Sequence, residues 1–169
     1  MPSGKKAVLL YSCALLAFAP ASAQRRPPTT PESVRGHFAS INRRLLEMAK
    51  DFPDDKYSFQ LKPEMRTFGA VIVHVASGNI YAAKAGRGEK VSWDELDPKD
   101  YKTKTQVVAL MEKSIADADA TLKSLPDDSF AKSVEPWLSL TEHSAEHYGL
   151  LVAYYRASGL TPPESRQKK

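Results

Sequence analysis

Residues 31–50, which read PESVRGHFASINRRLLEMAK, carry the pattern that decides the fold. Their apolar side chains recur at spacings of three and four residues, which places them on one face of an α-helix. This stripe consists of Val34, Phe38, Ile41, Leu45 and Met48. Thr30 suits the N-cap position, and Pro31 and Glu32 suit the first turn. The segment therefore predicts an amphipathic helix that begins near Pro31 and buries one face.

Three further segments show the same periodicity, at about 64–84, at about 104–125 and from about 134 to Gly159. The stripe of the first holds Met65, Phe68, Ile72, Val75 and Asn79, with Val71, His74 and Tyr81 beside it. The second stripe holds Val107, Met111, Ile115, Ala118, Leu122 and Leu125. The third stripe holds Leu140, His143, His147, Leu150 and Tyr154. Each segment is therefore predicted to be a helix with one buried face.

The chain shows neither the alternating pattern of a strand nor an internal repeat. The predicted fold is therefore all-α, a four-helix bundle with long crossover loops that spans residues 31–160. Residues 85–103 form a long connection, and a loop of this length usually covers something or allows a crossover. Trp93, Trp137 and Tyr155 are predicted to pack the ends of the bundle rather than to bind a ligand.

The N-terminal segment 1–23 has the pattern of a secretory signal. Lys5 and Lys6 precede a short apolar run, and small residues precede the expected cleavage site after Ala23. The prediction is a secreted or periplasmic protein with no stable membrane anchor after cleavage. An uncleaved anchor, or a lipoprotein modified at Cys13, is a weaker interpretation. Residues 24–30 and 161–169 are rich in proline and polar side chains and are predicted to be a flexible lead-in and tail.

Composition excludes several classes of protein. Hydrophobic residues make up 42% and charged residues 26% of the 169-residue chain, as in an ordinary globular domain. Without residues 1–23, the net charge of +4 falls to that of 22 basic against 20 acidic residues. A nucleic-acid partner is therefore not expected. Because the single cysteine is Cys13, the remaining chain has no disulfide and no cysteine metal site.

The histidines suggest a metal site. His143 and His147 are four residues apart on an apolar stripe, so both imidazoles can reach one ion. The alternative is a pair of buried neutral histidines that bond to their neighbours. His74 lies near the middle of the second predicted helix and can join them, and three histidines with an open position are typical of catalytic zinc. His37 is interpreted as a packing or surface residue.

Glu146 is the candidate catalytic residue. It completes the sequence HSAEH at 143–147, the pattern of inverted zincin proteases, in which it would be the general base. That class needs a further acidic ligand downstream, and only 22 residues follow His147. A protease is therefore disfavoured. Glu146 can instead orient a ligand or carry a proton, or it can be a solvated carboxylate at the edge of the stripe.

Two groups of sequence blocks extend these observations. The first group holds YSF at 57–59, PEMRTFG at 63–69, HVA at 74–76 and Asn79. The second holds HSAEHYG at 143–149, YYR at 154–156 and GLTPPES at 159–165. Together these blocks resemble the DinB/YfiT-like superfamily of four-helix-bundle predicted metalloenzymes. The resemblance covers about residues 31–165, and the two groups are more specific as a pair than either is alone.

The resemblance implies a divalent metal held by His74, His143 and His147, with Zn²⁺ or Ni²⁺ as the expected ion. Members with known chemistry include thiol-dependent isomerases and S-transferases. The expected function is therefore that of an exported metal-dependent enzyme, a hydrolase or thiol transferase whose substrate the sequence does not name. The alternative is a non-catalytic exported metal-binding or interaction protein. The sequence leaves a homodimer open.

Overall fold

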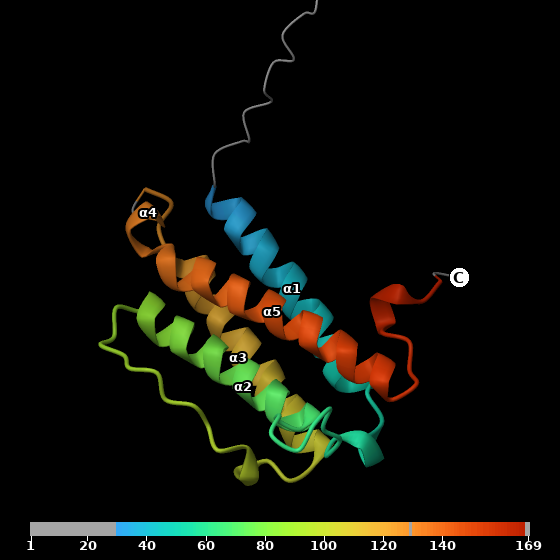
Figure 1. Cartoon of the computed structure of the whole chain (residues 1–169). Helices are drawn as coiled ribbons and strands as arrows, with labels where there is room; N and C mark the ends of the chain where they lie inside the picture. The colour runs from blue at the N-terminus through green and yellow to red at the C-terminus, as the bar shows by residue number, and fades with distance from the viewer. Residues whose placement is uncertain (1–29, 129, 168–169) are drawn as a thin grey trace, which may run out of the picture.

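The computed structural model describes residues 30–128 and 130–167 and shows a bundle of four long helices (Figure 1). The long helices are α1 (Pro31–Asp51), α2 (Phe68–Gly86), α3 (Lys104–Ser124) and α5 (Glu135–Ala157). Shorter elements are α4 (Phe130–Ser133) and the single 3-10 turns η1 (Asp54–Lys56), η2 (Pro98–Asp100) and η3 (Pro163–Ser165). Across these described ranges there is no strand, so the predicted all-α four-helix bundle is confirmed. The predicted signal segment 1–23 lies outside the described residues, as does the lead-in up to residue 29.

Helix α1 begins where the sequence predicts. The Thr30 side chain accepts a hydrogen bond from the backbone N–H of Ser33, and the Ser33 side chain accepts one from the backbone N–H of Thr30, each at 3.1 Å. This reciprocal pair is a capping box, which satisfies two of the free N–H groups at the start of the helix. The whole predicted stripe of α1 is buried. The periodicity therefore identified the face of α1 that the bundle covers.

Helix α2 begins at Phe68, later than the predicted start near residue 64. The Thr67 side chain supplies the cap, because it accepts a hydrogen bond of 3.1 Å from the backbone N–H of Ala70. The N–H of Phe68 donates to the carbonyl oxygen of Phe59 at 3.0 Å, so the preceding residues turn back on the helix instead of extending it. Met65 consequently lies outside α2, although its spacing matches the α2 stripe.

The order of packing determines which helices can share a site. Helix α2 packs against α3 and α5, and α1 packs against the same two helices, while α1 and α2 have little direct contact. Aromatic side chains fill the interior: the Phe52 and Phe68 rings stack at 3.7 Å, and Phe38 meets Trp137 edge-on at 5.9 Å. Trp137 and Tyr155 are fully buried, so their predicted packing role is confirmed.

Trp93 does not pack an end of the bundle, so that prediction is wrong. Its side chain is 49% exposed, and its ring centroid lies 5.5 Å from that of His74. The reason is the path of the connection between α2 and α3, which runs back along the outside of α2 (Figure 1). Trp93 therefore lies against the side of the bundle, over the middle of α2.

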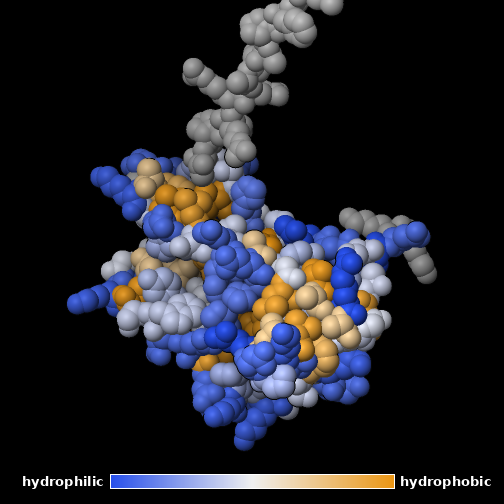
Figure 2. Space-filling model, viewed as in Figure 1, coloured by the Kyte–Doolittle hydropathy of each residue, from blue (hydrophilic) through white to orange (hydrophobic). Residues whose placement is uncertain are grey.

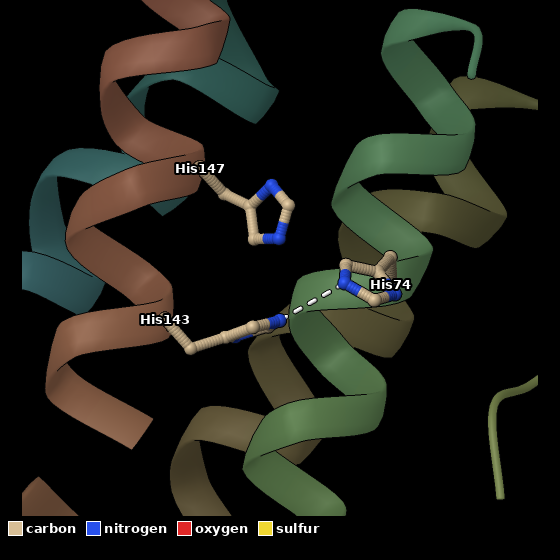
Figure 3. Close-up of side chains that lie close together, drawn as sticks. All are labelled: His74, His143 and His147. Atoms are coloured by element: carbon tan, nitrogen blue, oxygen red, sulfur yellow. Dashed lines mark hydrogen bonds between the residues drawn. The ribbon is translucent and has the colours of Figure 1, made fainter. Parts of the chain in front are cut away.

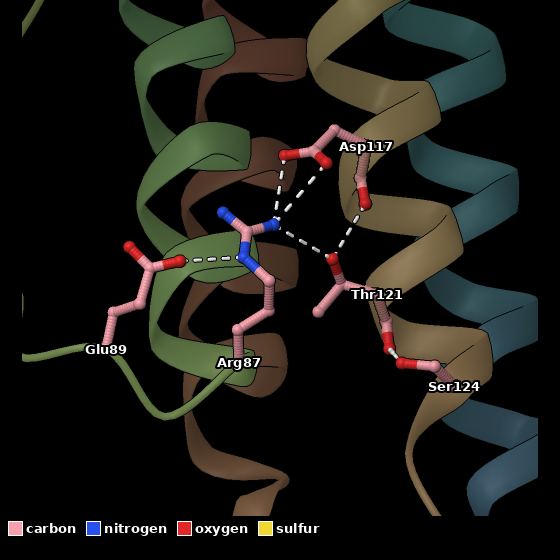
Figure 4. Close-up of polar contacts among 5 residues, drawn as sticks. All are labelled: Arg87, Glu89, Asp117, Thr121 and Ser124. Atoms are coloured by element: carbon pink, nitrogen blue, oxygen red, sulfur yellow. Dashed lines mark hydrogen bonds and ion pairs between the residues drawn. The ribbon is translucent and has the colours of Figure 1, made fainter.

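The start of this connection is fixed to α3 (Figure 4). The Arg87 guanidinium donates to a carboxylate oxygen of Glu89 at 2.7 Å, to Asp117 at 3.2 Å and to the hydroxyl of Thr121 at 3.2 Å. The next residue, Gly88, has a φ of +79°, a left-handed conformation that glycine adopts without steric strain. These contacts determine the direction in which the chain leaves α2.

The described part of the predicted tail, residues 161–167, contacts α1. Arg166 forms an ion pair with Asp51, with one nitrogen–oxygen distance of 2.8 Å, and Glu164 forms one of 2.8 Å with Arg43. On the molecular face in Figure 2, hydrophobic residues gather in separate patches, one of them over the C-terminal half of α5. Among the described helices, none has the length and apolar content needed to cross a membrane.

Candidate metal centre

Two adjacent helices, α2 and α5, carry the three histidines of the candidate site (Figure 3). His74 lies on α2, and His143 and His147 lie one turn apart on α5. Residues four apart project from one face of a helix, so both imidazoles of α5 can face α2. The structure thus brings together the three histidines that the sequence predicts as metal ligands.

The three imidazoles approach one another closely. The Nε2 atoms of His74 and His143 are 2.9 Å apart. The ring centroid of His147 lies 4.7 Å from that of His74 and 4.5 Å from that of His143. One ring nitrogen from each residue lies within 4.8 Å of the other two. Two nitrogens bound at about 2.0–2.1 Å to one ion are about 2.9–3.4 Å apart, so the spacing suits a shared ion after small ring rotations.

A hydrogen bond between neutral imidazoles also has a length of about 2.9 Å, and it is the alternative interpretation of the contact between His74 and His143. Such a bond leaves the other nitrogens of the cluster unexplained. The Nδ1 atoms of His143 and His147 are both buried and have no hydrogen-bond partner. The Nδ1 atom of His143 is not the nitrogen that faces His74, so the observation that points to an ion is the convergence of one nitrogen from each of the three rings, which a bond between two rings does not explain. The donor set therefore fits a divalent metal, and neutral imidazoles favour Zn²⁺, Ni²⁺ or Cu²⁺ over Mg²⁺ or Ca²⁺.

The surroundings keep the three imidazoles uncharged. Burial, followed by the neighbouring histidines and Arg66, lowers the pKa of His143 and of His147 to about 4. Burial also lowers the pKa of His74, although the nearby Glu95 carboxylate opposes this shift. At neutral pH each ring is therefore in the neutral form, which has a lone pair for an ion.

A carboxylate lies behind His74. Oε1 of Glu95 is 3.1 Å from Nδ1 of His74, at ion-pair distance but off the direction of an aligned hydrogen bond. Arg66 donates to both oxygens of Glu95, at 3.0 and 3.2 Å. Burial raises the pKa of Glu95, but His74 and Arg66 lower it by more, so the carboxyl group is ionised. A carboxylate in this position orients an imidazole and determines which of its nitrogens carries the proton.

Sequence reasoning did not identify Glu95. The acidic residue that the sequence singled out, Glu146, has an exposed side chain and no hydrogen bond or ion pair to the histidines within the described ranges. No spacing relates Glu95 to His74, since the two lie on different elements. The only signal was the length of the loop 85–103, which suggested that the loop covers something. His37 is exposed on α1 and lies outside the cluster.

The connection 87–103 lies over the histidines because it is fixed to α2. The backbone N–H of Leu96 donates to the buried hydroxyl of Ser77 at 3.1 Å, and that hydroxyl donates to the carbonyl oxygen of Val73 at 3.0 Å. Trp93 is three residues before Leu96, and its ring centroid lies 6.1 Å from that of His143. The loop therefore contributes an aromatic side chain and a carboxylate to the surroundings of the cluster.

Gly78 allows the close approach of His143 to α2. A Cβ atom at this position would lie 3.1 Å from both Cε1 and Nδ1 of His143 and 3.3 Å from Cδ1 of Leu140. These separations are shorter than ordinary carbon–carbon contacts, so an alanine would push the imidazole away from α2. The absence of a side chain at Gly78 is thus part of what positions the histidine.

Two cavities differ in their relation to this cluster. The larger, of about 700 Å³, lies at the starts of α2 and α3, where Thr67 and Thr103 already cap the helices, and no histidine lines it. The smaller, of about 190 Å³, has His143 in its wall. By size alone, the first cavity would be the candidate ligand site. The chemistry of the lining side chains selects the second.

Comparison with known proteins is consistent with these observations. The family model of the DinB superfamily matches residues 37–157. This range contains all three histidines, the connection that carries Glu95, and all four long helices except the first residues of α1. No curated protein matches the chain significantly.

Proposed function

The chain belongs to the DinB superfamily, and from this premise we propose that it binds one divalent metal ion through His74, His143 and His147. The observation that carries the proposal is that three neutral imidazoles from two helices place a nitrogen each within 4.8 Å of the others. Zn²⁺ and Ni²⁺ are the expected ions, since both accept imidazole nitrogen readily. Three protein ligands leave at least one coordination position for another molecule.

We propose further that the protein is a metal-dependent enzyme that activates a nucleophile. A bound ion would supply Lewis acidity and lower the pKa of a bound water or thiol. The chain's own groups support this role. Glu95 orients the imidazole of His74, Arg66 holds the Glu95 carboxylate, and Trp93 shields the histidines from solvent on the loop side. The proposed activity is a hydrolase or a thiol transferase, and Glu146 remains a predicted participant.

The alternative is a non-catalytic metal-binding protein, which a closed apolar cover over the histidines would favour. Trp93 covers part of the cluster, but a cavity of about 190 Å³ adjoins His143. A cavity next to a metal ligand gives a substrate room beside the ion, which favours the enzyme over a closed binding site. We therefore prefer the enzyme. Secretion or a periplasmic location is a proposal that rests on the pattern of residues 1–23.

Metal analysis of the purified protein tests the proposal. After incubation with Zn²⁺ or Ni²⁺ and removal of the excess, the protein should retain about one ion per chain, measured by mass spectrometry of the elements. His143→Ala should retain almost none. His37→Ala is the matched control, because it removes an exposed imidazole from a helix outside the cluster, and it should retain as much metal as the parent. An unaltered metal content in His143→Ala would refute the assignment.

A further inference from the structure

We propose that the cavity beside His143 binds an uncharged, mainly apolar ring of the molecule whose donor atom occupies the open position on the metal. This inference rests on the proposed metal site and adds a substrate class to it, that of a small ligand with a donor group attached directly to a flat apolar group. The cavity has a volume of about 190 Å³ and lies between α2, the start of α5 and the loop that carries Trp93.

The walls of the cavity are suited to an apolar ring. Trp93 and Tyr81 are aromatic, with ring centroids 5.9 Å apart, and Leu140 contributes an aliphatic side chain. No lysine, arginine, aspartate or glutamate lines the cavity, and its polar side-chain groups besides His143 are the hydroxyls of Tyr81 and Ser139 and the indole N–H of Trp93. A charged group placed there would lose its hydration without gaining a partner. The lining therefore favours an uncharged ligand group.

The size of the cavity limits the ligand. Pockets that enclose a whole drug-sized molecule have volumes of about 300–1,000 Å³, so a cavity of about 190 Å³ holds only part of one. A dry apolar cavity of about 150 Å³ is large enough to bind benzene. One six-membered ring therefore fits. His143 belongs to both the metal site and the cavity wall, so the two sites adjoin. A ligand bound to the metal would therefore reach the cavity with its ring only if the ring is attached close to the donor atom.

Trp93 exposes apolar surface that a ligand in the cavity would cover. Within the described residues, Trp93 and Leu138 are the two large hydrophobic side chains that are exposed, at 49% and 44%. Leu138 does not line the cavity, whereas Trp93 lines it and has its ring 5.5 Å from that of His74 and 6.1 Å from that of His143. The indole is also held in place, since the nearby Glu95 and Leu96 are both anchored to α2 or to its preceding turn. A ring in the cavity would cover this preorganised aromatic wall.

Two small metal-binding compounds test the inference. Benzohydroxamate and acetohydroxamate share one metal-binding group and differ in a phenyl against a methyl group. Calorimetry on the Zn²⁺-loaded protein should show that benzohydroxamate binds at least about tenfold more tightly than acetohydroxamate. This ratio is corrected for any difference in the affinities of the two compounds for free Zn²⁺. Trp93→Ala should reduce this ratio to about twofold or less. Leu138→Ala, which removes the other exposed hydrophobic side chain, should leave the ratio as in the parent.

The outcomes separate this inference from the proposed function. Equal corrected affinities for the two hydroxamates would overturn the apolar cavity site and leave the metal site standing. A preference that Trp93→Ala and Leu138→Ala reduce alike would also overturn it, because the phenyl group would then bind apolar surface without using this cavity. If the protein does not retain Zn²⁺ after loading and neither hydroxamate binds, the metal site and the cavity proposal are both overturned.

Discussion

Two polar clusters lie within the same apolar bundle and differ in how their polar atoms are satisfied. The asparagine cluster consists of Asn42, Asn79 and Ser114, which are 0–3% exposed and come from α1, α2 and α3. In it, the Asn79 amide donates to the oxygens of Asn42 and Ser114, each at 3.2 Å. The histidine cluster consists of His74, His143 and His147, and each of its residues has a buried Nδ1 atom without an aligned hydrogen bond.

The difference shows how a structural cluster can be distinguished from a candidate site. In the asparagine cluster, the side-chain oxygen of Asn79 lacks a partner, and the other polar side-chain atoms bond to one another or to backbone carbonyls. Such a cluster connects three helices and is closed to solvent. The histidine cluster adjoins a cavity and a long loop, and each of its three residues offers one neutral ring nitrogen within 4.8 Å of the other two, as a shared metal ion requires. Polar residues on a core stripe therefore need their partners counted before a role is assigned.

The largest expected effect separates the two clusters by metal removal. A metal that binds only the folded chain, at 100 times its dissociation constant, adds about 2.7 kcal/mol to the free energy of unfolding. Chelator should therefore lower the melting temperature of the parent. His143→Ala should lose this response, whereas Ser114→Ala should keep it in full. A chelator response that survives in His143→Ala would show that the clusters do not differ as proposed.

A pH titration of the metal-free protein should give a fall of several degrees in melting temperature. The pKa of His143 and His147 is lowered to about 4 in the folded protein, against about 6.5 in the unfolded chain. Between these values the unfolded chain binds more protons, so stability decreases as pH falls from about 7 to 5.

The double variant His143→Leu with His147→Leu serves as the comparison for this titration. Scanning calorimetry in chelator should show a shallower pH dependence in the double variant than in the parent. Equal slopes would mean that the two imidazoles are not buried as the structure has them.

The third effect concerns the carboxylate behind His74. Glu95→Gln removes the negative charge and should weaken Zn²⁺ binding by about tenfold, since groups that orient a metal ligand contribute about 10–100-fold to metal affinity. Glu89→Gln is the matched control, because Glu89 is an acidic residue of the same connection whose partner is Arg87. Competition with a fluorescent zinc indicator would measure both affinities. A tenfold loss of Zn²⁺ affinity in both variants would show that the effect comes from removing any negative charge from the connection and not from the position of Glu95 behind His74.

The smallest effect belongs to the asparagine cluster. Ser114→Ala removes one hydrogen bond from Asn79 and should lower the free energy of unfolding by about 1 kcal/mol. Urea denaturation in chelator would measure the change. Zinc affinity should stay within twofold of that of the parent, because Ser114 lies on α3 and does not contact the histidines. A large loss of metal affinity in Ser114→Ala would show that the asparagine cluster influences the histidine cluster and would contradict the distinction drawn between them.

Local and periodic features were readable from the sequence alone. The α1 stripe predicted its buried face because residues at spacings of three and four share one side of any helix. The capping residue Thr30 was predictable since a cap acts within its own turn. The i, i+4 spacing of His143 and His147 predicted that both imidazoles reach one point for the same reason. The place of His74 near the middle of the second predicted helix suggested it as their partner, and the resemblance to the DinB superfamily implied the same three ligands.

Only the tertiary structure decided which elements meet these histidines. Helix α2 begins at Phe68 and not near residue 64, because the Thr67 side chain caps the helix at that point. Trp93 and Glu95 lie in a loop without periodicity, so nothing local predicts the bonds of that loop to Ser77 and Arg66. Hydrogen bonds, ion pairs and cavities between distant segments depend on how the helices pack, which a local pattern does not encode. The histidines were thus visible in the sequence, and their carboxylate, their aromatic cover and the adjoining cavity arise from the fold.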